Sequence, residues 1–327
     1  MEIPTYEDVL RARTQIAPYL IRTPLHEYPA LSELIGARIF IKHENHEPTG
    51  AFKVRGGINL ISQLSTSERA RGVAAASTGN HGQSVAYAAQ LFGVHARVVV
   101  PENANPGKVA AMRSMGAEII FHGEKFDDAR KYCEALAEKE GLRYVHSGNE
   151  PLLIAGVATQ VVEMIEDQPE LEVIIVPVGG GSGAAGACIA ARAMNPKLRV
   201  IGVQSEAAPA ACESWRQRKL IEMPNATIAE GLATGTPFVL PQTIMWENLS
   251  GFELVSDEQI LGAMIWLIEH AHTLAEAAGA SSLAAAYQLR HELRAKTVGL
   301  VCSGGNATPA QVKFALDQPS LAAQAHP

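Results

Sequence analysis

Short apolar runs alternate along the chain with longer segments of helical periodicity. The runs are rich in Val, Ile and Ala, and several of them end in Gly, Ser, Pro or Asn. This alternation is typical of a mainly parallel sheet with helices on both faces, an α/β fold whose chemistry lies where strands end. The strands are expected at residues 38–42, 72–77, 96–100, 118–121, 144–146, 173–178, 200–204 and 298–302.

The middle of the chain contains its own strand–helix–strand–helix series, with helices expected from Pro106 and from Phe126. No repeat, low-complexity tract or Pro/Ser linker separates this segment from the rest. A chain of 327 residues is long enough for two lobes. We therefore predict a small domain over residues 76–148 and a large domain over residues 1–75 and 149–327.

Composition narrows the class of protein. Hydrophobic residues make up 47% of the chain and charged residues 19%, and no apolar stretch reaches membrane-spanning length. The N-terminus carries acidic residues and no apolar signal core, which predicts a cytoplasmic protein. The net charge of -7, without long runs of like charge, gives no footprint for nucleic acid or a membrane surface. A small-molecule ligand is therefore expected.

Metal-binding patterns are weak. The four cysteines are scattered and form no CxxC pair, which suits a reducing compartment and argues against a zinc or disulfide framework. His43 and His46 have three-residue spacing beside Glu44 and Glu47, and we interpret them as surface residues. No metal site is predicted.

The first motif with chemical potential is PTGAFKVRGG, residues 48–57. Lys53 is expected at the start of a helix that runs through Ile58 and Ile61. Near the positive end of a helix dipole and partly desolvated, an ammonium is disfavoured and its pKa falls. A neutral amine is what Schiff-base formation requires. Taken alone, the segment is explained more simply by an exposed lysine at a helix start.

The second motif is the glycine run at residues 178–183, between the apolar strand VIIVPV and a helix of small residues. Successive glycines let backbone N–H groups converge on an anion, and a helix N-terminus favours negative charge, so we predict a phosphate site. The identity of the phosphate stays open. Residues 181–186 also fit GxGxxG, and Glu206 lies about twenty residues further on, as a dinucleotide site requires.

Two further polar loops follow expected strands. STGNHG, residues 77–82, offers hydroxyls, an amide and free helix-start N–H groups, which suit a carboxylate. Helix capping by Ser77 or Asn80 explains part of that pattern but leaves His81 unexplained. CSGGN, residues 302–306, places the hydroxyl of Ser303 at a strand end, where it could donate to a neutral ring nitrogen. A glycine-rich turn is the simpler alternative.

Together and in this order, the four motifs resemble the β-family (fold type II) of pyridoxal-phosphate enzymes, especially the threonine/serine dehydratases and serine racemases. PTGAFKVRGG is similar to the family's PTGSFKxRGA, and STGNHG, GGGSG and SGGN match its other loops. The resemblance covers nearly the whole chain. It implies a tryptophan-synthase-β-like fold with two lobes, each a mainly parallel sheet flanked by helices. It also implies a homodimer or homotetramer.

The resemblance implies a role for particular residues. Lys53 would form the Schiff base with pyridoxal 5'-phosphate, with Phe52 and Gly231 beside the ring and Ser303 at the ring nitrogen. The cofactor-binding residues would be Phe52, Lys53, Asn80, Gly179, Gly180, Gly181, Ser182, Gly183, Gly231 and Ser303. The substrate carboxylate would be bound by Ser77, Thr78, Asn80 and His81. The implied reaction removes water and then ammonia from a small β-hydroxy amino acid such as L-threonine or L-serine, leaving a 2-oxo acid.

Three departures from the family pattern affect the expected activity. Thr78 stands where racemases place a serine, which weakens the case for racemisation. Glu276 opens EAAG instead of Glu-Pro-Ser/Ala-Gly. Gln204 and Ala210 replace carboxylates of metal-activated members, so we predict no activating divalent cation.

Alternative functions remain open at this stage. The same cofactor could serve amino-acid racemisation, or dehydration of a bulkier substrate such as 3-hydroxyaspartate or phenylserine. An NAD-dependent oxidoreductase built on residues 181–186 is more remote, since it leaves the other three motifs unexplained.

Overall fold

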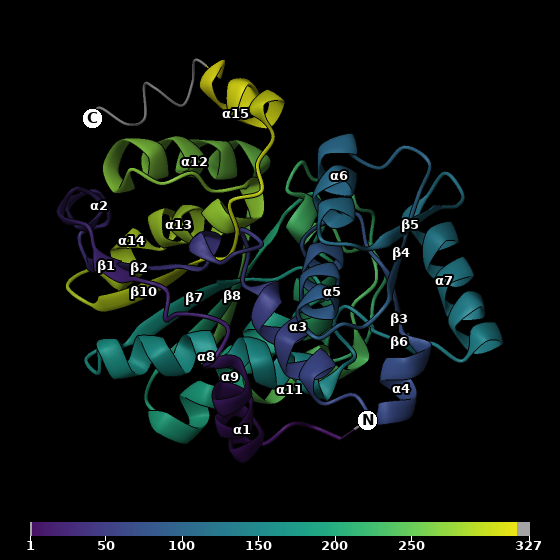
Figure 1. Cartoon of the computed structure of the whole chain (residues 1–327). Coiled ribbons are helices and arrows are strands. Elements are labelled where there is room, and N and C mark those ends of the chain that lie inside the picture. The colour runs from purple at the N-terminus through teal and green to yellow at the C-terminus, as the bar shows by residue number, and fades with distance from the viewer. Residues whose placement is uncertain (1, 319–327) are drawn as a thin grey trace. The chain divides into compact units, whose positions relative to one another are not determined.

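The structure is a computed structural model that describes residues 2–318, and the chain divides into two units (Figure 1). The first unit comprises Met1–Ile21 and Lys53–Val157, and the second comprises Arg22–Phe52 and Ala158–Pro327. The segment 76–148, expected as a small domain, lies within the first unit together with the helices of residues 1–21 and 53–75. The domain boundaries drawn from the sequence stay a prediction.

The first unit is built on a parallel sheet of four strands in the order β5-β4-β3-β6. The strands are β3 (Val73–Ala76), β4 (Ala96–Val100), β5 (Glu118–Phe121) and β6 (Arg143–Tyr144). Helix α7 (Phe126–Glu140) packs on one face, and α5 (Asn80–Leu91) and α6 (Pro106–Ser114) lie on the other (Figure 1). Both faces of β3 are therefore covered, which is why its four residues are all apolar and buried.

Three more helices complete this unit. Helix α3 (Lys53–Ser62) packs on α5, and α1 (Tyr6–Ile16) packs on α3. Helix α4 (Thr66–Arg71) begins in a capping box formed by Ser65 and Glu68 and leads directly into β3. Glycine makes the closest approach between α3 and α5 possible, because a Cβ at Gly57 would lie 2.3 Å from the hydroxyl oxygen of Ser84.

The second unit contains a six-stranded sheet in the order β1-β2-β10-β7-β8-β9. Its strands are β1 (Leu25–Glu27), β2 (Arg38–His43), β7 (Val173–Pro177), β8 (Arg199–Ser205), β9 (Gly251–Val255) and β10 (Thr297–Cys302). Only the short edge strand β1 pairs antiparallel, and the other pairs are parallel. The carboxyl ends of β7 and β10, which carry two of the predicted motifs, therefore point the same way.

Helices cover both faces of this sheet. On one face lie α2 (Pro29–Ile35), α12 (Asp257–Ala271) and α13 (Ala277–Gln288), with α14 (Arg290–Leu293) after α13 and α15 (Pro309–Leu316) against α12. The other face of the sheet is covered by α9 (Ser182–Met194) and α10 (Ala210–Gln217), and α11 (Val239–Asn248) packs on α9. Two short 3-10 turns, η1 (Glu44–His46) and η2 (Glu230–Leu232), belong to this unit, and α8 (Pro151–Asp167) joins it to the first.

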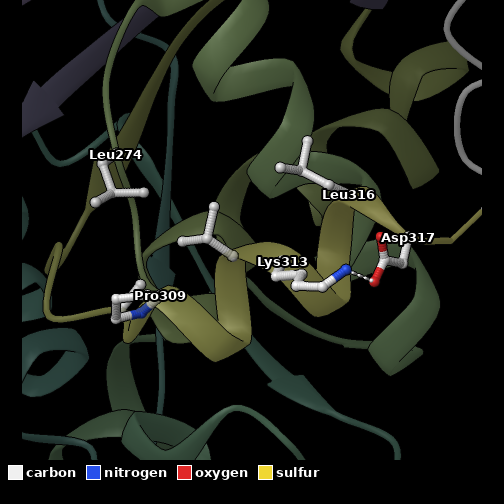
Figure 2. A pocket seen from close by; sticks show the side chains of 7 residues that line it. Leu274, Pro309, Lys313, Leu316 and Asp317 are labelled. Carbon is white, nitrogen blue, oxygen red and sulfur yellow. Dashed lines mark hydrogen bonds and ion pairs between the residues drawn. The ribbon is translucent and has the colours of Figure 1, made fainter.

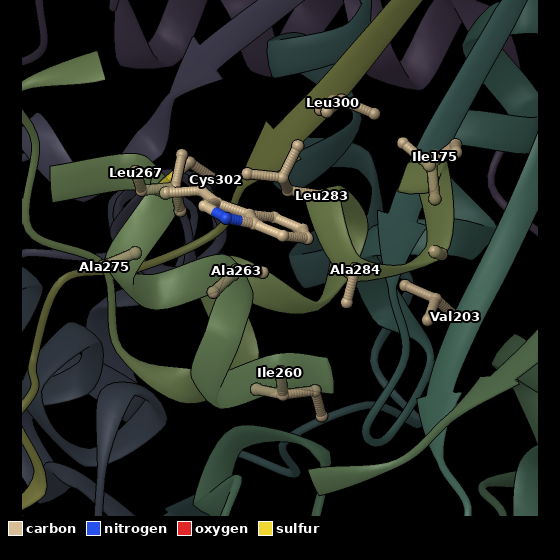
Figure 3. Close-up of a cluster of buried hydrophobic side chains, with 14 of the residues drawn as sticks. Ile175, Val203, Ile260, Ala263, Leu267, Ala275, Leu283, Ala284, Leu300 and Cys302 are labelled. Carbon is tan, nitrogen blue, oxygen red and sulfur yellow. The ribbon is translucent and has the colours of Figure 1, made fainter. Parts of the chain in front are cut away.

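The core of the second unit lies between the sheet and the α12–α13 layer. Figure 3 shows Ile175, Val203 and Leu300 from the strands facing Leu283 of α13, with Ile260 and Leu267 of α12 beyond it. All of these side chains are at most 2% exposed. Their burial excludes water from the sheet and fixes the strand ends from which the glycine-rich loops emerge.

The predicted α/β architecture is confirmed, and a strand lies at each of the eight expected positions. The strand expected at 144–146 is displaced, since β6 ends at Tyr144. Strands β1 and β9 were not predicted. Among residues 2–318, every helix is too short or too polar to span a bilayer.

Candidate active site

Helix α3 begins at Lys53, as the sequence predicts, and the residue is half-buried. Its Nζ donates a hydrogen bond to the backbone carbonyl of Ser147 at 2.9 Å. Burial lowers the pKa of Lys53 from 10.5 to about 8, because desolvation disfavours the ammonium. A useful fraction of the amine is therefore neutral near pH 7.5, and a neutral amine can act as a nucleophile or a base.

The backbone of Lys53 is fixed by α5. The hydroxyl of Ser84 donates to the Lys53 carbonyl at 2.7 Å, and Ser84 is fully buried. On the opposite side, a Cβ at Gly156 would lie 2.7 Å from the Arg55 carbonyl oxygen, so the start of α8 can touch α3 only through glycine. The support by Ser84 was missed in the sequence, because it lies outside the four motifs, whereas residues 153–156 resemble dehydratase sequence without indicating a contact with α3.

The STGNHG loop follows β3 and opens α5. Ser77 is buried and accepts a hydrogen bond from the N–H of Gly79 at 3.2 Å, while Thr78 and Asn80 are half-buried. Gly79 is the N-cap of this 12-residue helix and makes no side-chain cap bond. The helix therefore presents backbone N–H groups beside two hydroxyls and an amide, an arrangement suited to a carboxylate.

His81 is buried and neutral. Its Nε2 lies 2.9 Å from the carbonyl oxygen of Val145, so Nε2 carries the proton and Nδ1 is left as an acceptor. Among residues 2–318 that Nδ1 has no hydrogen-bond partner. Burial, with Lys53 nearby, lowers the pKa of His81 to about 3. His81 can therefore contact a ligand through a hydrogen bond but supplies no positive charge at neutral pH.

A second histidine, His146, lies on the same side of this unit and was not predicted. Its Nδ1 accepts hydrogen bonds from the N–H groups of Gly148 and Asn149, at 3.0 and 2.9 Å. Burial lowers the pKa of His146 to about 4, and Lys53 contributes to the shift. The signal was present in the sequence, because a polar turn, Ser-Gly-Asn, follows the strand expected at 144–146.

In the second unit, the glycine run follows β7 and leads into α9. Gly181 is the N-cap of α9 with φ of +85°, a conformation that favours glycine. A Cβ at Gly179 would lie 2.1 Å from the Gly231 carbonyl oxygen, and one at Gly180 would lie 2.3 Å from the Phe238 ring. Only glycine fits this loop, and the start of a 13-residue helix beside it suits an anion.

Phe52 belongs to the same neighbourhood as the glycine run. A Cβ at Gly183 would lie 3.1 Å from the Phe52 ring, so the aromatic side chain packs beside the first turn of α9. Ser182 and Gly183 are buried. The structure thus brings part of the first motif to the second within one unit.

The fourth motif pairs with the first. The N–H of Phe52 donates to the Ser303 carbonyl at 3.0 Å, and the N–H of Gly305 donates to the Gly50 carbonyl at 2.8 Å. Ala51 and Gly304 form an antiparallel bridge between these two bonds. Residues 50–52 and 303–305 therefore form a short two-stranded ladder, which fixes the buried Ser303 beside the residue that precedes Lys53.

A buried carboxylate, Glu276, lies beside this ladder. A Cβ at Gly304 would be 2.4 Å from the Glu276 Oε1, and one at Gly231 would be 3.9 Å from it. The N–H of Glu276 donates to the Gly304 carbonyl at 3.0 Å. Glu276 therefore lies between Gly231, the residue expected on the ring face, and Gly304, which follows Ser303. The sequence singled out Glu276 only as a departure from the family pattern.

The two histidines that we interpreted as surface residues differ in their exposure to solvent. His46 is exposed, as expected, but the interpretation of His43 was wrong, since it is 1% exposed. His43 ends the buried strand β2, and its Nε2 lies 2.9 Å from the Tyr28 hydroxyl. Burial lowers the pKa of His43 to about 4. In the described part of the chain, no group of three or more His, Cys, Asp or Glu side chains could hold a metal ion.

Gln204 and Ala210, which replace carboxylates of metal-activated family members, are both buried. The Gln204 side-chain oxygen accepts a hydrogen bond from the N–H of Cys212 at 3.1 Å. This oxygen therefore binds the backbone in the first turn of α10. Independence from divalent cations stays a prediction.

A pocket of about 500 Å³ lies along α15 in the second unit (Figure 2). Its lining is mainly apolar, with Leu274, Pro309 and Leu316 around it and an ion pair of 2.6 Å between Lys313 and Asp317. None of the predicted site residues lines it.

The predicted site residues therefore fall into two groups, one in each unit. The first unit brings together Lys53, Ser77, Thr78, Asn80 and His81. The second unit brings together Phe52, Gly179, Gly180, Gly181, Ser182, Gly183, Gly231 and Ser303. An amine of lowered pKa, a glycine loop for an anion and a neutral hydroxyl are thus present on the chain.

Comparison with known proteins gives consistent matches. Residues 16–304 match the family model described as "Pyridoxal-phosphate dependent enzyme". An L-threonine ammonia-lyase of Thermotoga maritima is 40% identical over 92% of this chain and 75% of its own length. An L-threo-3-hydroxyaspartate ammonia-lyase of Saccharomyces cerevisiae is 36% identical over 94% of each chain. The structure of maize serine racemase superposes with a TM-score of 0.91 at 30% identity, over 96% of this chain and 97% of that one.

These matches confirm the predicted fold class and cofactor, and they favour pyridoxal phosphate over the dinucleotide alternative. The matched region contains the first three motifs and residues 302–304 of the fourth. The chain belongs to the family of pyridoxal-phosphate-dependent enzymes.

Proposed function

We propose that this protein is a lyase that converts a small β-hydroxy amino acid, such as L-threonine or L-serine, to a 2-oxo acid and ammonia. The observation that carries the proposal is the enclosed Lys53 amine, whose pKa is lowered to about 8 by burial. The names of the two ammonia-lyases, at 40% and 36% identity over most of the chain, support this reaction class.

The residues present fit the cofactor. Pyridoxal phosphate needs an amine for its aldehyde and a cradle for its phosphate. Lys53 is the proposed amine. Gly179 to Gly183 are the proposed cradle, because side chains at Gly179 and Gly180 would collide with Gly231 and Phe238. Phe52 and Gly231 are the proposed neighbours of the ring, and Asn80 is proposed to contact the ring hydroxyl.

When bound, the cofactor supplies an electron sink that makes the substrate's Cα proton acidic. Lys53, once its amine is released by the substrate amine, is the proposed base for that proton. Ser303 is proposed to donate a hydrogen bond to the ring nitrogen without protonating it, since a hydroxyl is a weak acid. This limits the charge drawn into the ring and favours loss of the β-hydroxyl over transamination.

Ser77, Thr78, Asn80 and His81 are proposed to hold the substrate carboxylate. Two hydroxyls, an amide and the N-terminus of α5 supply donors, and the helix dipole favours the negative charge. The neutral ring of His81, with a pKa of about 3, has only an acceptor nitrogen free, so the proposed contribution of His81 is its backbone N–H in the first turn of α5. Binding through these neutral donors predicts little pH dependence of substrate affinity between pH 6 and 9.

The test is an oxo-acid assay across threonine, serine, 3-hydroxyaspartate and phenylserine, with and without a chelator. We expect release of a 2-oxo acid and ammonia in equal amounts from at least one of these substrates, unchanged by the chelator. The Lys53→Ala variant serves as the control and should lose at least about a thousandfold in rate. Absence of oxo acid with every substrate would overturn the proposal.

A second candidate is amino-acid racemisation. The likeness to maize serine racemase favours it. Thr78, half-buried and two residues after β3, replaces the serine of racemases but still carries a hydroxyl that could protonate Cα. Chiral chromatography of the unreacted substrate separates the two activities. A Thr78→Val variant that loses racemisation but keeps oxo-acid formation would assign this hydroxyl to racemisation alone.

We propose a cytoplasmic homodimer or homotetramer. The four cysteines are free and buried, which suits a reducing compartment. The assembly is proposed from the family resemblance. Light scattering of the purified protein tests it, and a mass of a single chain at micromolar concentration would exclude both assemblies.

A further inference from the structure

We propose that His146 is a positioning residue for Lys53: it fixes the turn that aims the Ser147 carbonyl at the lysine amine. This carbonyl would hold the amine whenever it is not covalently engaged, including the interval in which it carries the substrate's proton. The proposal rests on the proposed function, because it concerns the base of that reaction.

The first observation is the geometry of the turn. The Ser147 carbonyl accepts from Lys53 Nζ at 2.9 Å. The next two N–H groups, those of Gly148 and Asn149, both donate to Nδ1 of His146 at 3.0 and 2.9 Å. The peptide that contains the Ser147 carbonyl also contains the Gly148 N–H. The imidazole therefore holds one end of this peptide group while its other end faces the amine.

The second observation is the anchoring of the turn on both sides. Before it, the N–H of Val145 donates to the Ala74 carbonyl at 2.8 Å, and the Val145 carbonyl faces His81 Nε2 at 2.9 Å. After it, the carbonyl of Leu152 accepts from the side-chain amide of Asn59, on α3, at 2.7 Å. The turn is thus tied to β3, to α5 and to the helix that begins with Lys53.

The charge state of His146 agrees with this role. An Nδ1 that accepts two N–H groups carries no proton, so the neutral ring has its proton on Nε2. The structure places Nδ2 of the Asn149 side chain 3.4 Å from this Nε2. An amide turned by 180° would present its oxygen there, and an oxygen can accept that proton. Burial keeps the ring neutral through the physiological range, with Lys53 and Arg130 adding to the effect and Glu134 opposing it.

The chemical consequence concerns the direction of the amine. A neutral amine that donates one hydrogen to the Ser147 carbonyl has fewer orientations for its lone pair. When the amine takes up a proton, the same bond becomes charge-assisted and stronger. A mobile carbonyl would leave the amine free to rotate, and misplacement of a base lowers the rate of proton transfer without weakening substrate binding.

The test compares His146→Leu, which has no acceptor, with His146→Asn, whose Oδ1 is the same number of bonds from the backbone as Nδ1. With His146→Leu we expect kcat to fall about tenfold or more and KM to stay within about threefold. His146→Asn should restore most of the lost rate. His146→Gln, whose acceptor lies one bond further out, should behave like His146→Leu and replaces it if the leucine variant does not fold.

A second readout needs no turnover. The pKa of Lys53 is measured in cofactor-free protein by competitive acetylation across pH, with the modified lysine located by mass spectrometry. Loss of the carbonyl partner should lower that pKa by about half a unit or more in His146→Leu, since a hydrogen bond to the ammonium favours the charged form. His146→Asn should match the wild type.

Either of two results would overturn the proposal: wild-type kcat and Lys53 pKa in His146→Leu, or equal losses in His146→Asn and His146→Leu. Failure of the proposed function is recognised separately. In that case the wild-type protein gives no oxo acid, while the acetylation comparison still reports whether His146 positions the amine.

Discussion

The side-chain amide of Asn306 donates a hydrogen bond to the backbone carbonyl of Thr49 at 2.9 Å, across more than 250 residues of sequence. It closes the short ladder between residues 50–52 and 303–305. Gly50, at the turn, has φ of +67°, and a Cβ there would lie 2.7 Å from the Asn306 side-chain oxygen. The first and fourth motifs are therefore one structural unit, which fixes Ser303 and Phe52 together.

Two substitutions measure how much this ladder contributes to the free energy of unfolding. Gly50→Ala should lower the free energy of unfolding by about 2 to 4 kcal/mol, through backbone strain at positive φ and the collision with Asn306. Asn306→Ala should cost about 1 to 2 kcal/mol, because the bond to Thr49 is lost. Urea unfolding of both variants gives these values.

The double variant separates strain from collision. Removing the Asn306 side chain makes room for the new methyl group, so the two costs should sum to more than the cost in the double variant, by about 1 kcal/mol. Strict additivity would show that Gly50 is required for its backbone conformation alone.

The glycine cradle predicts a specific rescue. Gly180→Ala should weaken the affinity for pyridoxal phosphate at least about tenfold, because the new Cβ would lie 2.3 Å from the Phe238 ring and must displace the loop. Phe238→Leu in the same chain should recover part of the affinity by making space. Titration of cofactor-free protein, followed by absorbance, measures each dissociation constant. Unchanged affinity in Gly180→Ala would contradict the assignment of this loop to the phosphate.

The lowered pKa of Lys53 has a kinetic signature. The rate at which cofactor-free protein forms its adduct with pyridoxal phosphate should rise with pH up to about 8 and then level, since the neutral amine is the reacting form. An exposed lysine would give a rate that continues to rise toward pH 10.5. Stopped-flow absorbance between pH 6 and 10.5 distinguishes these outcomes, and the latter curve would mean that the amine is hydrated.

Three histidines, His43 and His81 buried and His146 half-buried, predict a loss of stability in acid. Burial lowers the pKa of His81 to about 3 and those of His43 and His146 to about 4. In the unfolded chain these histidines take up protons near pH 6.5. Their contribution to the free energy of unfolding is therefore present above that pH and is lost as pH falls toward 4. Each histidine adds about 1.4 kcal/mol per pH unit in this window.

The His43→Gln variant tests one of these terms. Between pH 6 and 4.5, the unfolding free energy of this variant should fall less steeply than that of the wild type. The two slopes should differ by about 1.4 kcal/mol per pH unit, which corresponds to one proton. His272→Asn, at the exposed end of α12, is the control and should keep the wild-type slope. Equal slopes in all three proteins would mean that His43 is protonated in the folded state.

Strand positions in the parallel sheets could be predicted because central strands such as β7 and β10 are largely apolar and rich in β-branched residues. β1 was missed because it has three residues, two of them exposed. β9 was missed because its sequence, GFELV, begins with glycine and contains a glutamate, so it is not a continuous apolar run. β6 ends early because the His146 ring binds the two backbone N–H groups of the turn that follows.

The candidate site could be predicted as far as its motifs reach. Each motif is local, and each places polar or glycine residues after an apolar strand, as with the glycine run after β7. The supports of Lys53 are not local: Ser84, Ser147 and His146 act through contacts across 31 and 94 residues of sequence, or through a turn outside any motif. Such contacts depend on how helices pack, which spacing along the chain does not encode.

Covalent trapping identifies the lysine that binds the cofactor. Native protein is reduced with borohydride, digested, and searched by mass spectrometry for a pyridoxyl group. We expect one label per chain, on Lys53, and none in the Lys53→Ala variant. A label on another lysine, or a protein that binds the cofactor without any reducible bond, would exclude Lys53 as the residue that binds the cofactor.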